Sequence, residues 1–341
     1  MHGQFVWYEL TTPDVDAARK FYPQITGWGN QPFDKDYSLW TAGGAPFAGL
    51  FRLSDALRQA GTPPNWLPYI EANNVDDTAK LAASIGGKIV HGPEDIPNTG
   101  RFALLQDPQG ANFGVYKSSG PSQAWNGTPV LGRFSWHELM TTDYKKAFDF
   151  YRRLFGWETM SEMDMGGGMM YSMFGKGNNR MFGGMFNRMP DMAGVPPFWL
   201  MYIFVKDVKK AVDVAVKNGA KLQRGPMDIP GGIIAILGDP QGAAFAVHQS
   251  TEVAAKPAPA AKTGAKKVAA KKPAKKAAAR KSAKKTKAKK AKKSAKKAAK
   301  RSARKASAKK SSRRKAAAKK SARKKTARRS SARGKRRARS R

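Results

Sequence analysis

Two Trp-x-Glu triplets carry the side chains best suited to chemistry in this chain of 341 residues. Trp7 and Glu9 recur 129 positions later as Trp136 and Glu138. In an extended strand, residues two apart project from the same face, so each Trp should lie beside its Glu. Desolvation next to an indole raises the pKa of a carboxyl group towards the range that serves proton transfer. We therefore predict Glu9 and Glu138 as catalytic residues. The alternative is that they satisfy backbone groups or pair with an arginine.

The two triplets belong to an internal repeat that covers most of residues 1–250. Short motifs return in the same order in the second half, and so many ordered matches indicate a duplicated domain. We predict a first domain at residues 1–117, a linker rich in Ser, Gly and Pro at 118–130, and a second domain at 131–250. The matched motifs include Trp7-Tyr8-Glu9-Leu10 with Trp136-His137-Glu138-Leu139, Gly27-Trp28 with Gly156-Trp157, Tyr37-Ser38-Leu39-Trp40 with Tyr171-Ser172-Met173-Phe174, and Asp107-Pro108-Gln109-Gly110 with Asp239-Pro240-Gln241-Gly242.

Hydrophobic periodicity predicts the same plan of strand, helix and strands, taken twice, in each repeat. Asp14 and Asn74 precede helical patterns in the first repeat, and Asp143 and Asp207 hold the same positions in the second. We predict Thr12 or Asp14, and then Asn74, as helix N-caps of the first repeat, and helices that follow Asp143 and Asp207 in the second. The helix after Asn74 should stop at Gly86-Gly87. The strands and hairpin segments predicted in the first repeat are Phe5–Leu10, Tyr37–Leu53, Trp66–Ala72, Phe102–Leu105 and Ala111–Tyr116.

A paired unit of this kind, ending in Asp-Pro-Gln-Gly, resembles the vicinal oxygen chelate superfamily. That superfamily includes glyoxalase I, methylmalonyl-CoA epimerases, fosfomycin- and bleomycin-resistance proteins and extradiol dioxygenases. The resemblance covers residues 3–117 and 132–249. It implies an α+β fold of tandem glyoxalase-like domains, each made of two βαβββ modules that form a curved sheet around a cleft.

The resemblance also implies metal-ligand positions, because enzymes of the superfamily usually hold a divalent cation through His or Glu on strands one, four, five and eight. The fourth-strand ligand should lie within 47–52 or 182–187, and neither stretch contains His, Asp or Glu. None of the matched side chains offers a lone pair to a hard or borderline cation. We therefore predict no metal and no cofactor, and we do not expect glyoxalase or dioxygenase activity. The positions matched on strands one, five and eight are Trp7, Leu67 and Gly114, and Trp136, Leu200 and Ala246.

Strand alternation from those positions adds aromatic and polar side chains to each cleft. Both clefts then offer a Trp, a Glu and a Tyr, the usual composition of a site for an organic ligand. His248 joins the second cleft, and we predict it as a catalytic acid or hydrogen-bonding group. The alternative is that the aromatic residues belong to the core and His248 has a structural role. The predicted ligand-binding residues are Trp7, Tyr69, Tyr116, Trp136 and Tyr202.

The segment from Met160 to Met192 contains ten methionines. A thioether cluster suits soft metals, but adaptable packing around hairpins is the better interpretation. The same segment contains Gly166-Gly167-Gly168 and Gly183-Gly184. These runs lack the sequence context of a phosphate-binding loop, so we predict them as turns.

The formal net charge of +40 is concentrated at one end of the chain. Residues 253–341 contain 41 of the 64 Lys and Arg and no Asp or Glu, whereas residues 1–252 contain 23 basic and 24 acidic residues. Only Val253 and Val268 exceed Ala among the apolar side chains of this tail, so we predict residues 251–341 to be disordered when free. The tail resembles the C-terminal domains of linker histones and the tails of some bacterial nucleoid proteins.

Counterion release should drive binding of the tail to DNA or RNA, with strong salt dependence. Because the tail has no aromatic residue, it cannot stack on bases and should be indifferent to sequence. An anionic membrane surface is the weaker alternative, since no apolar anchor accompanies the charge. The predicted nucleic-acid-binding residues are Lys271, Lys272, Lys284, Lys285, Lys292, Lys293, Lys296, Lys297, Arg313, Arg314, Arg328, Arg329, Arg336 and Arg337.

Several classes of protein are excluded or disfavoured by composition. The absence of cysteine excludes disulfides, thiolate metal sites and cysteine nucleophiles. No apolar run is long enough to span a bilayer, and the N-terminal residues lack the basic and apolar regions of a signal peptide. We expect a cytoplasmic, nucleoid-associated protein with no integral membrane part.

The combined prediction is a protein that binds a small organic ligand in metal-free clefts and is tethered to nucleic acid by its tail. It is similar in this respect to bleomycin-resistance proteins. Two alternatives remain open. One is a metal-independent enzyme of lyase or isomerase type that uses Glu9 and Glu138 as acid or base. The other is a nucleoid-architectural protein whose glyoxalase-like body is inactive.

Overall fold

The structure is a computed structural model, and it describes residues 2–59, 61–120, 129–177, 180–192 and 194–251. The predicted nucleic-acid-binding residues all lie outside the described residues, as does the central part of the predicted linker.

The first repeat forms one mixed sheet of eight strands in the order β2-β3-β4-β1-β5-β8-β7-β6. β1 pairs with β4 in parallel and with β5 in antiparallel orientation, and β5 pairs with β8 in parallel. The two βαβββ modules therefore join at the β1–β5 pair. The strands are β1 (Phe5–Thr12), β2 (Gly29–Pro32), β3 (Tyr37–Ala42), β4 (Ala45–Arg52), β5 (Asn65–Glu71), β6 (Lys88–Ile96), β7 (Gly100–Gln106) and β8 (Asn112–Ser118).

The second repeat forms a second sheet of eight strands with the equivalent order, β10-β11-β12-β9-β13-β16-β15-β14. Within the described residues, neither sheet contains a strand of the other repeat, so each repeat forms its own sheet without strand exchange. The α+β fold class of two glyoxalase-like sheets is confirmed. The strands are β9 (Phe134–Thr141), β10 (Glu158–Asp164), β11 (Met170–Gly175), β12 (Met181–Asn187), β13 (Phe198–Phe204), β14 (Lys221–Ile229), β15 (Gly232–Gly238) and β16 (Ala244–Ser250).

Asp14, rather than Thr12, and Asn74 are the N-caps of the first repeat, and Asp143 and Asp207 cap the helices predicted to follow them. Each of these four side chains accepts a hydrogen bond from a backbone N–H in the first helical turn. The helix after Asn74 ends before Gly86, as predicted. The four helices that the caps begin are α1 (Val15–Thr26), α3 (Val75–Ser84), α4 (Tyr144–Phe155) and α5 (Val208–Lys217), and the remaining helical segments are α2 (Asp55–Gln59) and the 3-10 turn η1 (Pro190–Met192).

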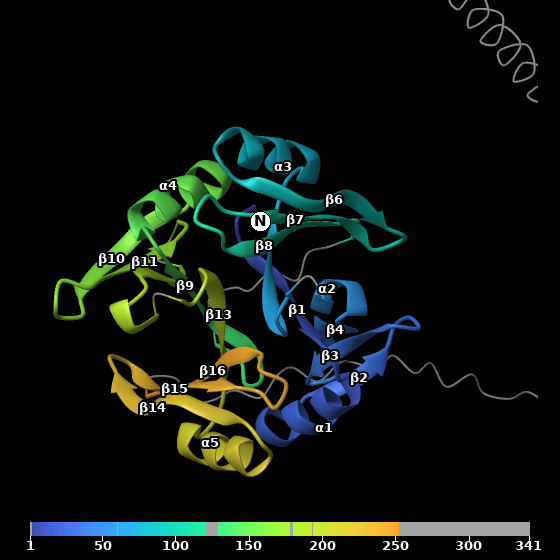
Figure 1. The fold of residues 1–341 in the computed structure, drawn as a ribbon, viewed down its shortest axis with the longest axis vertical. Helices are drawn as coiled ribbons and strands as arrows, with labels where there is room; N and C mark the ends of the chain where they lie inside the picture. The colour runs from blue at the N-terminus through green and yellow to red at the C-terminus, as the bar shows by residue number, and fades with distance from the viewer. Residues whose placement is uncertain (1, 60, 121–128, 178–179, 193, 252–341) are drawn as a thin grey trace, which may run out of the picture. The chain divides into compact units, whose positions relative to one another are not determined.

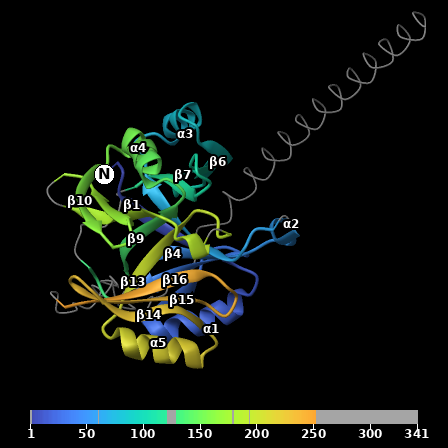
Figure 2. The ribbon, with the colours of Figure 1, turned by 60° about the vertical axis from the view of Figure 1, so that its left-hand side comes forward.

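Helices of different repeats meet at both ends of the molecule. Figure 1 and Figure 2 show α1 of the first repeat beside α5 of the second, and α3 of the first beside α4 of the second. Both pairs lie on the sides of the sheets that are turned towards the core. The two repeats therefore pack as one compact unit rather than as separate bodies.

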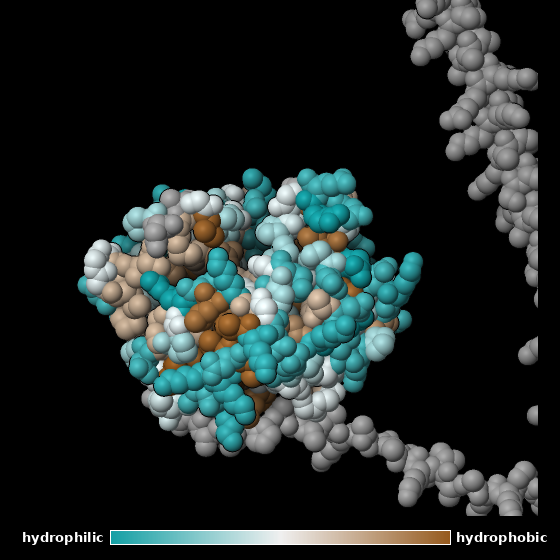
Figure 3. Space-filling model, turned by 60° about the horizontal axis from the view of Figure 1, so that its bottom comes forward, coloured by the Kyte–Doolittle hydropathy of each residue, from teal (hydrophilic) through white to brown (hydrophobic). Residues whose placement is uncertain are grey.

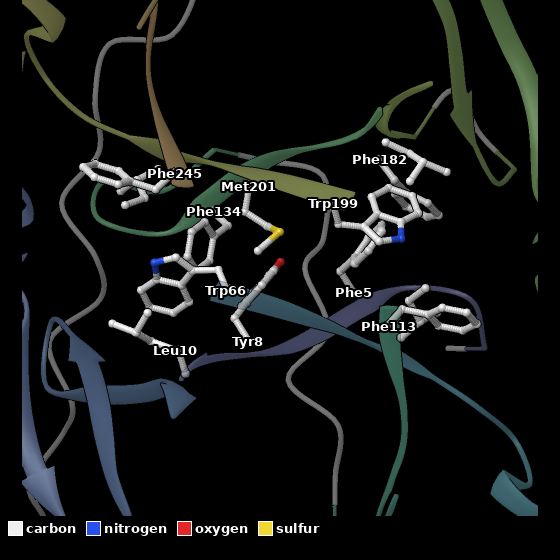
Figure 4. Packing of buried hydrophobic residues seen from close by; sticks show 14 of the residues in the cluster. Phe5, Tyr8, Leu10, Trp66, Phe113, Phe134, Phe182, Trp199, Met201 and Phe245 are labelled. Carbon is white, nitrogen blue, oxygen red and sulfur yellow. The ribbon is translucent and has the colours of Figure 1, made fainter. Parts of the chain in front are cut away.

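The core between the sheets is built from aromatic residues of both repeats (Figure 4). At its centre the Tyr8 hydroxyl lies 2.6 Å from His137 Nε2, and Phe5 stacks on the imidazole at a centroid distance of 3.6 Å. The other ring nitrogen, Nδ1, lies 2.7 Å from the carbonyl of Phe182 and must donate to it. Complete burial lowers the pKa of His137 to about 3, so the imidazole is neutral and Nε2 accepts from Tyr8.

Two reciprocal hydrogen bonds join the repeats away from this centre. The Tyr22 hydroxyl on α1 donates to Asp239 Oδ2 at 2.9 Å, and the equivalent Tyr151 hydroxyl on α4 donates to Asp107 Oδ2 at 3.2 Å. Each aspartate belongs to an Asp-Pro-Gln-Gly turn, and its other oxygen accepts backbone N–H groups of that turn. One carboxylate thus fixes a hairpin of its own repeat and a helix of the other.

Two tryptophans form a second reciprocal pair of hydrogen bonds, each to the first residues of the other repeat. Trp28 Nε1 donates to the carbonyl of Gly132 at 2.6 Å, and Trp157 Nε1 donates to the carbonyl of Gly3 at 2.7 Å. Since Trp28 and Trp157 are equivalent positions, as are Gly3 and Gly132, the contacts relate the repeats by an approximate two-fold axis.

One prediction about glycine was wrong. Gly166-Gly167-Gly168 has positive φ throughout and forms a turn, as predicted, but Gly183-Gly184 lies inside β12. A Cβ at Gly183 would overlap the carbonyl of His137, and a Cβ at Gly184 would overlap the Tyr171 ring. These glycines therefore permit close approach rather than chain reversal.

No helix among the described residues is long and apolar enough to cross a membrane.

Tyr22→Phe should lower the free energy of unfolding by about 2 to 3 kcal/mol, because the buried carboxylate of Asp239 and the indole N–H of Trp66 both lose a partner. Tyr151→Phe should have a similar effect. Urea denaturation of the full chain measures both. Tyr144→Phe is the matched control, since Tyr144 is a largely buried tyrosine whose hydroxyl forms no hydrogen bond with the described residues. A Tyr22→Phe effect no larger than that of the control would show that these bonds do not hold the repeats together.

Candidate functional site

The face of each sheet that is turned away from the core carries one partly buried glutamate. We call these the Glu9 face and the Glu138 face. On the neighbouring positions of β1 and β9, Tyr8 and His137 point the other way, into the core. The alternation predicted from the Trp-x-Glu triplets therefore places Trp7 with Glu9, and Trp136 with Glu138.

On the Glu9 face, two tyrosines hold the carboxylate. Tyr37 of β3 donates to Glu9 Oε1 and Tyr69 of β5 donates to Glu9 Oε2, both at 2.7 Å. Trp7 Nε1 donates to the Tyr37 hydroxyl at 3.1 Å. We call these four residues the Glu9 group.

The Glu138 face repeats this arrangement residue for residue. Tyr171 of β11 and Tyr202 of β13 donate to the two oxygens of Glu138, each at 3.0 Å. Trp136 Nε1 donates to the Tyr171 hydroxyl at 2.7 Å. We call these four residues the Glu138 group. The structure thus brings together the predicted residues Trp7, Glu9 and Tyr69, and likewise Trp136, Glu138 and Tyr202.

Burial shifts the titration of both groups in the same direction. Desolvation raises the pKa of Glu9 and of Glu138, and the two tyrosine hydrogen bonds on each carboxylate offset part of this effect. Desolvation and the adjacent carboxylate also raise the pKa of all four tyrosines, which therefore remain neutral hydrogen-bond donors. Each group is chemically a carboxyl with two phenols, able to accept or release a proton at the carboxyl oxygens.

Glycines make room for the tyrosine rings. Gly49 of β4 pairs with Glu9, and a Cβ there would overlap the Tyr37 ring; Gly184 of β12 pairs with Glu138 and has the same relation to the Tyr171 ring. On β8, a Cβ at Gly114 would overlap the Tyr69 ring. A larger residue at any of these positions would displace a phenol from its carboxylate.

These faces do not fit the divalent metal that the superfamily resemblance implies. At the matched positions Trp7, Leu67 and Gly114 supply no donor atom, and at Gly114 the Tyr69 ring fills the space that a ligating side chain would need. Glu9 and Glu138, the carboxylates nearest to these positions, already accept a hydrogen bond on each oxygen. Within the described residues, no cluster of three or more His, Cys, Asp or Glu could hold a metal ion.

Two predicted site residues lie on the same faces but do not join the Glu groups. Tyr116 donates its hydroxyl to the carbonyl of Thr99 at 2.9 Å. His248 lies 3.1 Å from Ser135 Oγ through Nδ1, and its strand partner Phe204 is four residues along β13 from Leu200, the partner of Glu138. Burial lowers the pKa of His248. The structure therefore does not pair His248 with Glu138 as acid and base.

Sequence reasoning missed Tyr37 and Tyr171 as members of the site. Both occur in one of the repeated motifs, so the signal was present in the match of Tyr37-Ser38-Leu39-Trp40 with its second copy. They lie 28 and 33 residues from the glutamates that they bind. Only the pairing of β3 with β4, and of β11 with β12, brings them onto the same face.

The Glu138 face carries an apolar cluster that is separate from the main core. Apolar residues gather in patches bordered by hydrophilic ones in the space-filling view (Figure 3). On the Glu9 face, the positions equivalent to Phe198 and Ala244 are Asn65 and Asn112. Each face therefore has an equivalent glutamate, but the surroundings of Glu138 are less polar than those of Glu9. The cluster consists of Leu200, Tyr202 and Ala246 with Trp136, Phe198, Ile234, Ile236 and Ala244 packed against them.

The Glu138 face is also spanned by a contact between its two sides. The Arg224 guanidinium on β14 lies 3.9 Å from Met189 Sδ, just beyond β12. Five strand spacings separate β12 from β14, about 24 Å in a flat sheet. Two side chains cannot bridge that distance unless the sheet curls or the segment after β12 folds over it. The Arg224–Met189 contact therefore brings the two sides of the Glu138 face together. On the first sheet, residues 95–101 and 117–119 line an open cavity of about 370 Å³, and this lining includes no residue of the Glu9 group.

Comparisons with known proteins agree with this fold. The family profile described as Glyoxalase/Bleomycin resistance protein/Dioxygenase superfamily matches residues 133–247. CFP32 from Mycobacterium tuberculosis, a protein named as a glyoxylase, is 33% identical over 249 residues, which are 71% of this chain and 92% of CFP32. The anthracycline biosynthesis protein DnrV from Streptomyces peucetius is 29% identical over 265 residues, 73% of this chain and 94% of DnrV.

Solved structures show the same architecture at low sequence identity. The Mn(II)-bound glyoxalase from Novosphingobium aromaticivorans has a TM-score of 0.51 and 16% identity, over 73% of this chain and 82% of that chain. The 2,3-dioxygenase LapB from Pseudomonas sp. KL28 has a TM-score of 0.52 and 11% identity, over 75% of this chain and 97% of that chain. These likenesses concern the fold alone.

Glu138→Gln should become more stable relative to the wild type as the pH rises. Because folding raises the pKa of Glu138 above its ordinary value of 4.5, the folded state holds the proton more tightly than the unfolded state. The wild type therefore loses stability from about pH 4.5 up to the folded pKa, by at most about 1.4 kcal/mol per pH unit, and Gln does not titrate.

Urea denaturation between pH 4 and 8 measures this difference. Glu9→Gln should behave in the same way. Glu162→Gln, on the opposite face of β10 and exposed, is the control and should show no such trend. A wild type that gains stability relative to Glu138→Gln as the pH rises would contradict the direction of the shift.

Proposed function

The chain belongs to the Glyoxalase/Bleomycin resistance protein/Dioxygenase superfamily, and from this we propose that it binds a small organic ligand at its Glu faces without a metal. The observation that carries the proposal is the Glu138 group, a carboxyl held by two phenols beside an indole and an apolar cluster. Such a combination of apolar surface with few convergent polar groups is typical of sites for organic ligands.

The geometry of the group supports recognition of a hydroxyl or amide on the ligand. Each oxygen of Glu138 accepts one hydrogen bond from a tyrosine and keeps a second acceptor direction. The partly buried indole of Trp136 and the side chains of Phe198 and Ile234 offer a flat apolar surface for a ring. The relatives named for anthracycline biosynthesis support a polycyclic ligand.

The raised pKa of Glu138 also supports the enzyme alternative. A carboxyl whose pKa lies above its ordinary value can remove a proton from a bound ligand and return it, which is the requirement of a metal-independent isomerase or lyase. Tyr202, which already donates to Glu138, would orient the ligand, and His248 remains a proposed hydrogen-bonding group at the far end of the face.

Ligand binding should raise the melting temperature of the full chain by the same amount with and without EDTA, because no metal takes part. A panel of aromatic metabolites and antibiotics, followed by thermal unfolding, is the measurement. Glu138→Gln should weaken binding of a stabilising compound by about tenfold, since a hydrogen bond to a charged group contributes about 1.5 to 3 kcal/mol. Glu162→Gln is the control on the same sheet.

The outcome separates the candidate functions. Turnover of a bound compound that Glu138→Gln abolishes while binding persists would assign the enzyme. Stabilisation only after addition of Mn²⁺, Zn²⁺, Ni²⁺ or Fe²⁺ would contradict the metal-free proposal. A melting temperature that no compound in the panel changes would favour an architectural protein with an inactive body.

We propose further that residues 253–341 tether the protein to DNA or RNA. The observation is compositional, 41 Lys and Arg without one Asp or Glu, and it includes the paired residues from Lys271-Lys272 to Arg336-Arg337. Neutralised phosphates release their counterions, and this gives affinity without sequence preference. A tether of this kind would keep the ligand-binding body close to nucleic acid, the basis for proposing a nucleoid-associated location.

Affinity for duplex DNA should fall by about three orders of magnitude or more between 50 and 200 mM salt, because many phosphates are neutralised at once. Fluorescence anisotropy with two unrelated duplexes of equal length measures it, and both should bind equally. Deletion of 254–341 should abolish binding, with circular dichroism as the control that the remaining chain is folded. Binding that survives the deletion would contradict the assignment.

A further inference from the structure

The two Glu faces differ in the charged residue on their edge strands, β6 and β14, which we call the rim. On β6 of the first sheet, His91 pairs with Glu94, with 2.8 Å between His91 Nε2 and Glu94 Oε2. The equivalent positions on β14 are Arg224 and Met227. The second sheet therefore has a permanent cation where the first has a titratable one, and it has replaced the acidic partner by a thioether.

The side chain of Arg224 lies on the Glu138 face and not on the face that is turned towards the core. It pairs in register with Ile236, a member of the apolar cluster, so both side chains project from the same face. Its guanidinium reaches over that face to Met189 Sδ. Among the side chains that the structure describes, no carboxylate lies within 4 Å of Arg224, and a thioether is only a weak acceptor.

The charge of Arg224 acts on the Glu138 group. It lowers the pKa of Glu138 and of Tyr202, in opposition to the larger effect of burial on both. Register pairs connect Arg224 through Ile236 and Ala246 to Tyr202, the residue that binds Glu138, so the guanidinium and the carboxyl border the same apolar cluster. The apolar cluster, with Phe198, Leu200 and Ile236, occupies the same face.

We propose that the Glu138 face takes a flat organic anion, with its ring on the apolar cluster, its carboxylate on Arg224 and a hydroxyl on Glu138. This rests on the proposed function and names the ligand class of one of the two faces. The planar guanidinium matches a carboxylate through two parallel hydrogen bonds, and the ligand would displace the Met189 contact to form them. The Glu9 face lacks this preference, because its rim residue His91 is already paired with Glu94.

The test compares 6-hydroxy-2-naphthoate with its neutral analogue, 6-hydroxy-2-naphthamide, by isothermal titration calorimetry on the full chain. The naphthoate should bind at least tenfold more tightly than the amide. Arg224→Gln should remove the preference, and Arg224→Lys, which keeps the charge but not the planar fork, should retain part of it. Arg153→Gln, at an exposed position of α4, removes one positive charge elsewhere and should preserve the preference. The basic tail is the same in every variant, so its attraction for the anion cancels when the naphthoate affinities of the variants are compared, and the same titrations on the chain without residues 254–341 remove it from the comparison of the two probes.

Equal affinity for the two probes, or a preference that survives in Arg224→Gln, would overturn the proposal. Failure of the naphthoate to bind would also overturn it. The proposed function is tested separately by Glu138→Gln. If that variant weakens both probes without any preference for the anion, the face binds organic ligands and only the ligand class is wrong. If it changes the affinity of neither probe, the proposed function itself fails.

Discussion

A buried aspartate in each Asp-Pro-Gln-Gly turn accepts a hydrogen bond from a tyrosine of the opposite repeat, and the positions of both sheets depend on this exchange. Asp107 and Asp239 would be costly to bury alone, but turn amides and a phenol satisfy each of them. The phenols come from the first helix of the other repeat. Neither repeat therefore satisfies its own turn completely, and the pair folds as one unit with its core between the sheets.

This arrangement leaves one face of each sheet for ligand chemistry. The strands β1 and β9 contribute Tyr8 and His137 to the core, so the alternate residues, Glu9 and Glu138, must face away from it. On that side the superfamily scaffold places donors for a metal, and here tyrosines reach the central carboxyl through spaces left by glycine. In the proposed function the phenols supply fixed hydrogen bonds in place of a cation, and the site works by hydrogen bonding and proton exchange rather than as a Lewis acid.

The sequence was sufficient for the fold, the helix caps and three of the four residues in each Glu group, because strand alternation and internal repetition are local signals. It was not sufficient for Tyr37 or Tyr171, since their contact with a glutamate depends on which strands become neighbours in the sheet. The interpretation of Gly183-Gly184 as a turn failed for a related reason. In the sequence, a glycine that permits close approach between strands looks the same as a glycine that adopts a positive φ. The position of the Tyr171 ring, which the sequence does not give, shows that Gly184 is of the first kind.

The two repeats differ at positions where a substitution costs little folding free energy. The tyrosines that bind the Asp-Pro-Gln-Gly turns of the opposite repeat, Tyr22 and Tyr151, are the same in both because each fills a closed and fully satisfied environment. The rim of the Glu faces is exposed, and exchanging the His91–Glu94 pair for Arg224 removes a contact that contributes at most about 1 kcal/mol. A duplicated domain with a shared core can thus keep one stability requirement and acquire two different ligand preferences. The guanidinium of Arg224 beside an apolar cluster, without a carboxylate partner among the side chains that the structure describes, is the consequence of that freedom.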